Sequence, residues 1–392
     1  MKILYLITST RGHGQGGHAM SLKTISETMV AIGDVCILCI GVLPLAIFRQ
    51  SNVKTEYIFY NGKKTINVIR DILHKINEVK PDIIHSFDTR ALFFARIAAL
   101  RYRLPLVHTK AGGPNPTRWY PFAKTLICFS KENYDYFRAQ PKFRKTALHL
   151  IPNRAVEPPE DPARVAEVRA LAKGAPVLMR IARIGNTYAE SFRQTIRLSN
   201  ELTNRGARHA LVLVGVVEDQ PVLEELKKMA QGLEVHFLTD SHFTLNAAEL
   251  VPAADLVVGT GRSIQEAASK GKVLLTPLAG SAMPVLVNKE NVEALMVTNF
   301  SPRNVLIDYS EQQTIAMIAE LTNDSLKRKE YSHFSKKFFI DHFDIRSALP
   351  RYEAIYRVAS FSMGCWIGDL LHGLITTVRA FDYDRRQRDT TS

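Results

Sequence analysis

Short apolar runs that alternate with helical patterns constrain the fold of this chain more than any other feature. Each run is bounded by turn residues, as expected for strands of a parallel sheet that is buried on both faces. In the first half the predicted strands are Ile3–Thr8, Val35–Ile40, Tyr57–Tyr60, Asp82–His85, Leu106–Thr109, Leu126–Phe129 and Leu148–Ile151. In the second half they are Val177–Ala182, Ala210–Gly215, Val235–Leu238, Leu256–Val258, Val273–Thr276 and Ala294–Val297. The rhythm predicts an α/β protein built from doubly wound parallel sheets.

A proline-rich segment separates the two series of strands. Four prolines lie in the twelve residues from 152 to 163, and a proline lacks the amide hydrogen that the interior of a sheet or helix requires. We therefore expect an N-terminal domain over residues 1–155, a C-terminal domain over 156–342 and a closing segment over 343–392. Ligands of doubly wound sheets bind beyond the carboxyl ends of the strands, so the cleft between the domains is the expected site.

Positive charge is concentrated in the first of these domains. The whole chain has 51 Lys and Arg against 38 Asp and Glu, and residues 1–155 hold 23 of the former and 9 of the latter. Such asymmetry indicates an anionic partner for the first domain, either nucleic acid, a membrane surface or an acidic substrate.

The cysteines bear on the redox compartment of the protein, and the apolar stretches bear on whether the chain spans a membrane. Four cysteines in 392 residues do not form a disulfide scaffold, which favours a reducing compartment. Cys36 and Cys39 lie three residues apart on a predicted strand and point to opposite faces, so we expect buried structural thiols and no shared metal. The uncharged stretch Val35–Phe48 is too short to span a bilayer.

Two glycine-rich loops are candidate anion sites. Gly12, Gly14, Gly16 and Gly17 precede a predicted helix, whose first amides and dipole favour a phosphate. Their spacing differs from G-x-G-x-x-G, which disfavours a dinucleotide site, and a mobile surface loop is the alternative. The second loop, 259–262, contains Arg262 and leads into a helix expected to begin near Ser263.

Glu266 follows three residues after Ser263, and the pair also fits an S-x-x-E capping box. In that arrangement the Glu266 side chain would only close the end of the helix.

The order of these motifs resembles the retaining nucleotide-sugar glycosyltransferases of the GT-B fold (glycosyl transferases group 1, glycosyltransferase family 4-like). The likeness covers most of the chain. It lies in Gly16–Gly17, Lys80–His85, Ile127–Ser130, Leu150–Asn153, Ile181–Ile184, Ala254–Val273 and Phe343–Tyr356. The resemblance implies two Rossmann-like domains that face each other across a cleft. It further implies that the second domain binds a nucleotide diphosphate-sugar, that the first faces the acceptor, and that the closing helix crosses back towards the first domain.

The resemblance also implies roles for single residues. Glu266 would hydrogen-bond the donor ribose, Arg183 would neutralise the diphosphate, and the amides of Gly16 and Gly17 would contact the same phosphates. Tyr188, Gly261, Arg262 and Ser263 are the other expected donor-site residues. Stabilising the departing diphosphate is the main catalytic task. No metal or other cofactor is expected, because in this scheme a phosphate oxygen accepts the proton of the acceptor hydroxyl.

Two donor-site positions depart from the family pattern. Tyr188 stands five residues after Arg183, where the family has a lysine, and a phenol supplies no charge. Arg180 and Arg262 are candidate replacements, and opposite strand parity of Arg180 and Arg183 favours Arg262. Val258 occupies the place of the first glutamate of an E-x7-E pair. Its absence leaves the donor sugar open and makes a non-catalytic GT-B subunit, or a GT-B sugar-nucleotide epimerase or hydrolase, the alternatives.

The first domain departs from the pattern as well, since Ala111 stands where the family often has a histidine. His108 and Lys110 are the nearby polar residues. Either side chain could contact the acceptor or the sugar, or it could simply end a strand.

The tail and the basic half suggest where the protein works. Val358–Val378 is long enough to span a bilayer, but Asp369 near its middle would cost about 3 kcal/mol. We expect a helix packed on the first domain or lying on a membrane surface, followed by fraying over Arg379–Ser392.

Basic residues interleave with aromatic residues between positions 101 and 145. They are Arg101, Arg103, Lys110, Arg118, Lys124, Lys142, Arg144 and Lys145, and the aromatic residues are Trp119, Tyr120, Phe122 and Phe143. No nucleic-acid motif accompanies them. The resemblance favours an anionic membrane surface, because many such transferases extend lipid-linked glycans at the cytoplasmic membrane face, with a solvated basic surface as the alternative.

The favoured hypothesis is a retaining, metal-independent hexosyltransferase. It would move a sugar from a nucleotide diphosphate-sugar, with UDP as the expected nucleotide, to a saccharide or lipid-linked glycan in cell-surface polysaccharide or lipopolysaccharide assembly. The expected location is the cytoplasm, peripheral at the inner face of the cytoplasmic membrane.

Overall fold

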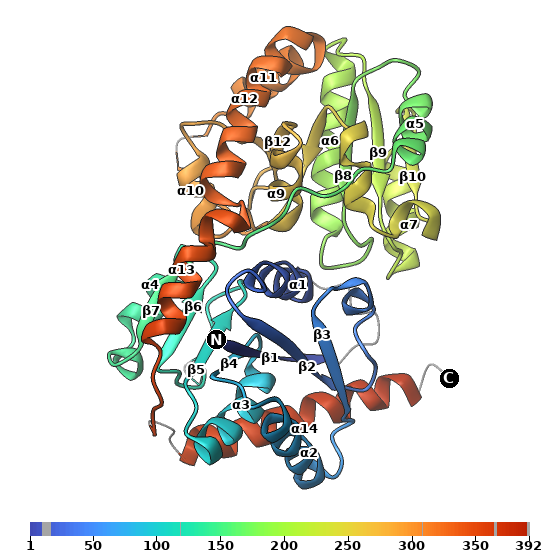
Figure 1. The fold of residues 1–392 in the computed structure, drawn as a ribbon. Helices are drawn as coiled ribbons and strands as arrows, with labels where there is room; N and C mark the ends of the chain where they lie inside the picture. Colours follow the sequence, from blue (N-terminus) through green and yellow to red (C-terminus); the bar gives the residue numbers. More distant parts are fainter. Residues whose placement is uncertain (10–16, 118, 308, 364–366, 390–392) are drawn as a thin grey trace. The chain divides into compact units, whose positions relative to one another are not determined.

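The structure, a computed structural model, describes residues 1–9, 17–117, 119–307, 309–363 and 367–389. The chain divides into two compact units (Figure 1). Unit 1 comprises Met1–Arg154 together with Ile345–Ser392, and unit 2 comprises Ala155–Asp344. Each unit is a parallel or mostly parallel sheet covered by helices on both faces.

Unit 1 contains a seven-stranded parallel sheet in the order β3-β2-β1-β4-β5-β6-β7. The strands are β1 (Lys2–Ser9), β2 (Asp34–Gly41), β3 (Lys54–Phe59), β4 (Ile83–Ser86), β5 (Leu106–Lys110), β6 (Thr125–Cys128) and β7 (Ala147–Leu150). The chain builds outwards from β1 to β3 and then returns to place β4 on the other side of β1. The switch point of this sheet therefore lies between β1 and β4.

The helices of unit 1 form two layers. They are α1 (Gly17–Met29), α2 (Thr65–Val79), α3 (Thr89–Tyr102), α4 (Lys131–Ala139), α13 (Ile345–Val358) and α14 (Ile367–Asp389). Helices α1 and α13 cover the face to which Ile3, Tyr5 and Ile7 point. Helices α2, α3 and α14 cover the opposite face, with Leu4 and Leu6. This alternation on β1 is the signature of a strand buried on both sides.

The predicted separation of the two N-terminal cysteines is confirmed. Cys36 and Cys39 are both buried, and they belong to hydrophobic clusters on opposite faces of the sheet. Burial also raises the pKa of the Cys39 thiol to about 12, which keeps it protonated and unreactive.

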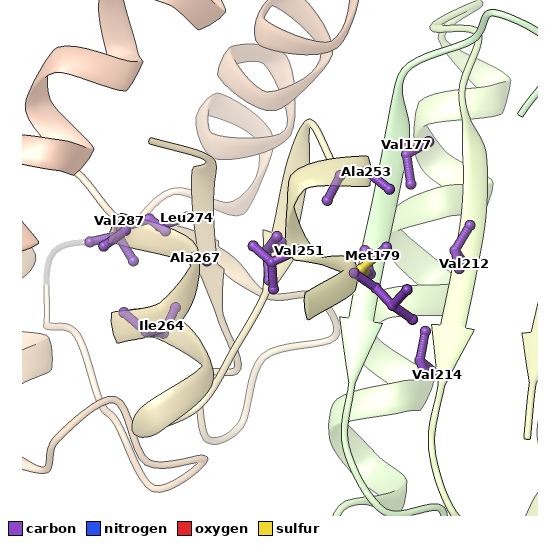
Figure 2. Close-up of a cluster of buried hydrophobic side chains, with 14 of the residues drawn as sticks. Val177, Met179, Val212, Val214, Val251, Ala253, Ile264, Ala267, Leu274 and Val287 are labelled. Carbon is purple, nitrogen blue, oxygen red and sulfur yellow. The ribbon is translucent and has the colours of Figure 1, made fainter. Parts of the chain in front are cut away.

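Unit 2 contains a six-stranded sheet in the order β10-β9-β8-β11-β12-β13. The strands are β8 (Val177–Ile181), β9 (Ala210–Val214), β10 (Val235–Leu238), β11 (Leu256–Val258), β12 (Val273–Thr276) and β13 (Val285–Leu286). The helices are α5 (Pro162–Leu171), α6 (Ala189–Asn204), α7 (Gln220–Met229), α8 (Ser241–Thr244), α9 (Arg262–Ser269), α10 (Val292–Val297), α11 (Glu311–Asn323) and α12 (Ser325–His342). Figure 2 shows part of one core cluster of unit 2, to which Ile264 and Ala267 of α9, Val251 and the strand residues Met179 and Val212 belong.

Twelve of the thirteen predicted strands are present, with ends displaced by three residues at most. The prediction of a strand at Ala294–Val297 is wrong, because these residues belong to α10. The sixth strand is instead β13, which pairs antiparallel with β12. Strong helix formers such as Glu293 and Leu295 fill the window 292–297, and Leu295 is its buried residue, so one buried position per turn satisfies the core.

The tail is a separate helix from the closing helix. Helix α13 ends at Val358, residues 359–363 have no regular structure, and α14 begins at Ile367. The prediction of fraying over Arg379–Ser392 is wrong for residues 379–389, because α14 continues to Asp389. Phe381 explains the continuation, since its ring is fully buried 4.6 Å from the ring of Tyr60 and holds the end of α14 on unit 1. Within the described parts of the chain, no helix is both long and apolar enough to cross a bilayer.

Candidate functional site

The strongest candidate site lies at the switch point of the unit 2 sheet. Strand β8 pairs with β9 on one side and with β11 on the other, and the chain reaches β11 only after β10. The loops that follow β8 and β11 therefore leave neighbouring strands at the same edge and diverge, which is where doubly wound sheets bind ligands. These two loops contain the predicted donor-site residues of this unit.

Arg183 lies in the loop after β8 and is half-exposed. Its Nη1 donates to Oε1 of Glu218 at 2.5 Å, and its guanidinium carbon lies 5.5 Å from the ring centre of Tyr188. Partial burial opposes the charge of Arg183, but hydrogen bonds with Tyr188 and Glu218 outweigh it and raise the pKa. The side chain is therefore a permanent cation with one face open to solvent.

The loop after β11 turns sharply into helix α9. Gly261 is the N-cap residue and has a φ of +51° and a ψ of −113°, a conformation that costs little only for glycine. Ser263 Oγ accepts a hydrogen bond from the Thr260 amide at 2.8 Å and so braces the turn. Gly261 has no side chain with which to cap the first turn of α9, and a helix start of this kind suits an anion.

Glu266 and Arg262 form an ion pair on α9, one turn apart. Arg262 Nε donates to Glu266 Oε1 at 2.7 Å, and both side chains are mostly buried. The capping-box alternative for Ser263 and Glu266 is wrong, because Gly261 occupies the N-cap and the Glu266 carboxylate is held by Arg262. Glu266 is thus fixed within the first two turns of α9, on the side of the helix that carries Arg262.

Arg180 is the buried cation of this region. The side chain has no exposed surface, and its guanidinium donates to Ser191 Oγ at 2.9 Å and to the Val258 carbonyl at 3.1 Å. Among the residues that the structure describes, it forms no ion pair with a carboxylate. Burial lowers the pKa of Arg180 to about 10, so it stays charged at neutral pH.

Tyr188 links the two arginines of the β8 segment. Its ring centre lies 6.0 Å from the guanidinium carbon of Arg180 and 5.5 Å from that of Arg183. An aromatic ring near two cations is attracted to both through its negative face. At the position where the family pattern has a lysine, this chain therefore has an aromatic ring in contact with two arginines.

Only some of the predicted site residues of unit 1 are among the described residues. Gly12, Gly14 and Gly16, as well as Arg118, lie outside the described residues. Gly17 is the exposed first residue of α1, and apart from its chain neighbours no described residue lies within 4 Å of the position that a Cβ would take there. Ser21 Oγ lies 2.8 Å from the Gly17 carbonyl and 2.6 Å from Oδ1 of the buried Asn153. These contacts hold the start of α1 next to the segment that follows β7.

His108 and Lys110 lie on β5 and differ in accessibility. His108 is fully buried, with Nδ1 2.8 Å from Ser86 Oγ and Nε2 2.6 Å from the Tyr120 hydroxyl. Burial lowers the pKa of His108 to about 3, so the ring is neutral. This environment favours the strand-end role that the sequence left open for His108. Lys110 is half-buried at the end of the strand and donates to the Gly112 carbonyl.

Asp88 is a residue that sequence reasoning missed. It stands at the switch point of the unit 1 sheet, directly before α3, and its carboxylate accepts hydrogen bonds from the amides of Arg90 and Ala91 at 3.0 and 2.8 Å. The other carboxylate oxygen accepts from the Thr8 amide at 2.8 Å and thus ties the ends of β1 and β4 together. An aspartate directly before a helical pattern is an N-cap signal, and this signal could have identified it.

Comparison with known proteins adds the fold-level relationship. No model of a protein family matches this chain, and no curated protein matches it in sequence. Among solved structures, Anabaena Alr3699/HepE in complex with UDP-glucose is 18% identical, with a TM-score of 0.65 over 91% of this chain and 100% of that chain. A glycosyltransferase from Rickettsia africae ESF-5 is 13% identical, with a TM-score of 0.64 over 91% of this chain and 97% of that chain.

A third similar structure, from Listeria monocytogenes, is assigned as a UDP-N-acetylglucosamine 2-epimerase. It is 15% identical, with a TM-score of 0.56 over 92% of this chain and 99% of that chain. At these identities the likeness establishes the fold and not the reaction. The predicted GT-B fold, with two doubly wound α/β units, is confirmed.

Proposed function

We propose that this protein is a glycosyltransferase that uses a nucleotide diphosphate-sugar, with UDP as the nucleotide, as its donor. The observation that carries the proposal is the charge on the two segments that leave the switch point of unit 2. Arg183 follows β8, the buried Arg180 lies on β8, and the Arg262–Glu266 pair lies on α9, whose N-cap is a glycine. Cations and helix amides at one edge suit a diphosphate. The complexes of HepE with UDP and UDP-glucose support this class of donor for a chain of the same fold.

Different residues of unit 2 bind different parts of the donor. Glu266, held by Arg262, accepts hydrogen bonds from the ribose hydroxyls, and the half-exposed Arg183 meets the diphosphate. Negative charge develops on the diphosphate as the bond to the sugar breaks, and these cations stabilise it. The acceptor hydroxyl attacks from the face that the diphosphate leaves, its oxygen bonds to the sugar carbon, and its proton passes to a phosphate oxygen. The anomeric configuration is retained, and no metal is required.

Unit 1 supplies the acceptor side in this proposal. With residues 345–392 included it holds 30 Lys and Arg against 14 Asp and Glu, while unit 2 holds 21 against 24. An excess of cations suits an anionic acceptor, or the anionic membrane that carries a lipid-linked glycan. We therefore place the reaction in surface-glycan assembly, at the cytoplasmic face of a membrane.

A thermal-shift series over UDP-, GDP-, ADP- and dTDP-sugars tests the donor assignment. A ligand that binds only the folded protein raises its melting temperature, so UDP and its sugars should give the largest increase. An increase confined to another nucleotide would identify that nucleotide, and not UDP, as part of the donor. No increase with any of these ligands would contradict the proposed donor site.

Val258 favours a second candidate function. It stands where the first glutamate of an E-x7-E pair would contact the sugar, and one structure of the same fold is assigned as a UDP-sugar epimerase. An epimerase or hydrolase would alter UDP-sugar, or release free sugar, in the absence of any acceptor. Tight UDP binding without turnover, even with crude glycan acceptor, would instead indicate a non-catalytic subunit.

A further inference from the structure

An open apolar groove lies in unit 1, away from the switch point of unit 2. It has a volume of about 890 Å³ and is lined by the first turn of α2, by α3 and by the middle of α14. Its apolar lining includes Ile66, Ile69, Phe93, Ile97, Leu371 and Leu374. Ile66 is 74% exposed and Leu371 is 56% exposed. Apolar side chains gathered at one exposed hollow usually mark a binding surface.

Helix α14 forms a fixed wall of this groove. Asp369 at its start accepts hydrogen bonds from Lys142 Nζ at 2.7 Å and from the Phe122 amide at 2.8 Å. In the middle, a Cβ at Gly373 would lie 3.1 Å from the Phe93 ring, so glycine permits the close approach of α14 to α3. The burial of Phe381 holds the far end. The groove is therefore a formed feature of unit 1.

Positive charge borders one end of the groove. Lys64 lines it directly and precedes the first turn of α2, and Lys63 and Arg70 are exposed beside it, with the exposed Asp71 as the acidic neighbour. The positive end of the α2 dipole adds to this potential. Exposed lysine and arginine at one end of an apolar hollow suit a surface that meets an anionic lipid.

We propose that the groove binds the acyl chain of an anionic membrane lipid, whose headgroup meets Lys63 and Lys64. The apolar lining excludes water from the hydrocarbon chain, and the lysines at one end neutralise the headgroup phosphate. The inference rests on the membrane association within the proposed function and gives it a site. Lipid binding here needs no sugar donor, so it can be tested separately from glycosyl transfer.

The test titrates lysophosphatidylglycerol, below its micelle concentration, into the full-length protein by calorimetry. Val378 lines the groove, and Val378→Trp should fill it and weaken binding by about tenfold or more, since contact with the apolar chain is lost. Val358→Trp is the matched control, because Val358 is 74% exposed at the end of α13 and does not line the groove. It should bind as the unchanged protein does.

Surface variants keep the test decisive if Val378→Trp fails to fold. Ile66→Asp and Leu371→Asp should each weaken lysophosphatidylglycerol binding by about tenfold, whereas Leu326→Asp, on an equally exposed leucine of unit 2, should not. Lys64→Glu should weaken binding of lysophosphatidylglycerol but not of neutral lysophosphatidylcholine. Lys329→Glu in unit 2 carries the same charge change and should have no effect.

Three results would overturn the proposal. The first is unchanged lipid binding in Ile66→Asp and Leu371→Asp, and the second is a Lys64→Glu variant that loses both lipids equally. The third is a dimer in sedimentation that Leu371→Asp dissociates while no lipid binds, which would assign the groove to a second copy of the chain. The UDP-induced thermal shift should be the same in all variants, so loss of lipid binding is distinct from failure of the donor site.

Discussion

At the scale of the residue, three side chains of unit 2 show how one sequence pattern can support two interpretations. Glu266 was compatible both with closing a helix and with holding a ribose, and its ion pair with Arg262 removes the first of these. Arg180 and Arg262 were both candidates for the missing lysine. Arg262 is neutralised by Glu266, whereas Arg180 has no carboxylate partner in the described residues, so the structure shifts the balance towards Arg180 as the uncompensated charge.

Removing Arg183 or Glu266 should abolish glycosyl transfer, with different effects on folding. Arg183 is half-exposed and its ion pair with Glu218 is a surface pair worth at most about 1 kcal/mol, so Arg183→Ala should lower the melting temperature only slightly. Glu266→Ala should lower the melting temperature more, because the mostly buried Arg262 loses its partner. Turnover with UDP-sugar should fall below detection in both variants. Arg193→Ala on α6, which removes surface pairs with Glu190 and with Glu225 of α7, is the control and should retain turnover. Normal turnover in both site variants would show that the donor site lies elsewhere.

Arg180→Met should weaken diphosphate binding without unfolding the protein. A buried cation without a carboxylate partner is costly in the empty protein, and a bound diphosphate offsets that cost. The melting temperature of the unliganded variant should stay the same or rise, and the increase caused by UDP should shrink. Uridine, which lacks phosphate, provides the comparison and should stabilise both proteins equally. A variant that melts early but responds normally to UDP would make Arg180 a purely structural residue.

At the scale of the element, helix α13 depends on a buried polar network. The Tyr356 hydroxyl lies 2.7 Å from Nδ1 of His85 and 2.8 Å from the Tyr5 hydroxyl, and Nε2 of His85 lies 2.7 Å from Thr109 Oγ1. All of these groups are buried. The network joins α13 to β1, β4 and β5 within unit 1, although more than 200 residues separate α13 from these strands in the chain.

Two tyrosines one turn apart on α13 give a matched test of this network. Tyr356→Phe removes a hydroxyl that serves two buried partners and should lower the free energy of unfolding by about 1–3 kcal/mol. The Tyr352 hydroxyl is also buried but has no hydrogen-bond partner among the described residues, so Tyr352→Phe should cost nothing or stabilise. Urea unfolding measures both. Equal losses in the two variants would show that ring packing, not the network, holds α13.

At the scale of the whole molecule, the uneven charge becomes a property of unit 1. The closing segment adds to the excess of cations already present in residues 1–155, and unit 2 is close to neutral. A donor site needs only a few placed cations, such as Arg183, whereas the wider excess suits an extended anionic surface.

Binding to vesicles should follow this charge. The protein should associate with phosphatidylglycerol-containing vesicles at low ionic strength and dissociate as salt rises, since exposed charges more than about 10 Å apart are screened at 0.1 M salt. Flotation with neutral phosphatidylcholine vesicles is the comparison and should recover less protein. Equal recovery from both kinds of vesicle, or from neither, would contradict an electrostatic contribution to membrane binding.

Much of the architecture could be predicted from the chain because its signals are local. Runs of β-branched and apolar residues between turn residues predicted twelve of the strands, and the prolines of 152–163 predicted where the series breaks. The window 292–297 was misjudged because short apolar runs look alike in strands and buried helices, and only the antiparallel pairing of β13 with β12 settles it.

The sequence by itself determined the fold class, the two series of strands and the candidate residues that follow β8 and β11 in unit 2, since hydrophobic periodicity and turn chemistry act over a few residues. Only the tertiary structure decided which charges are compensated. Arg262 meets Glu266, Arg180 is buried beside Val258, and His108 is enclosed by Ser86 and Tyr120. Burial and pairing depend on what distant segments bring to the same place, and these two quantities determine whether a charged side chain is free to act on a ligand.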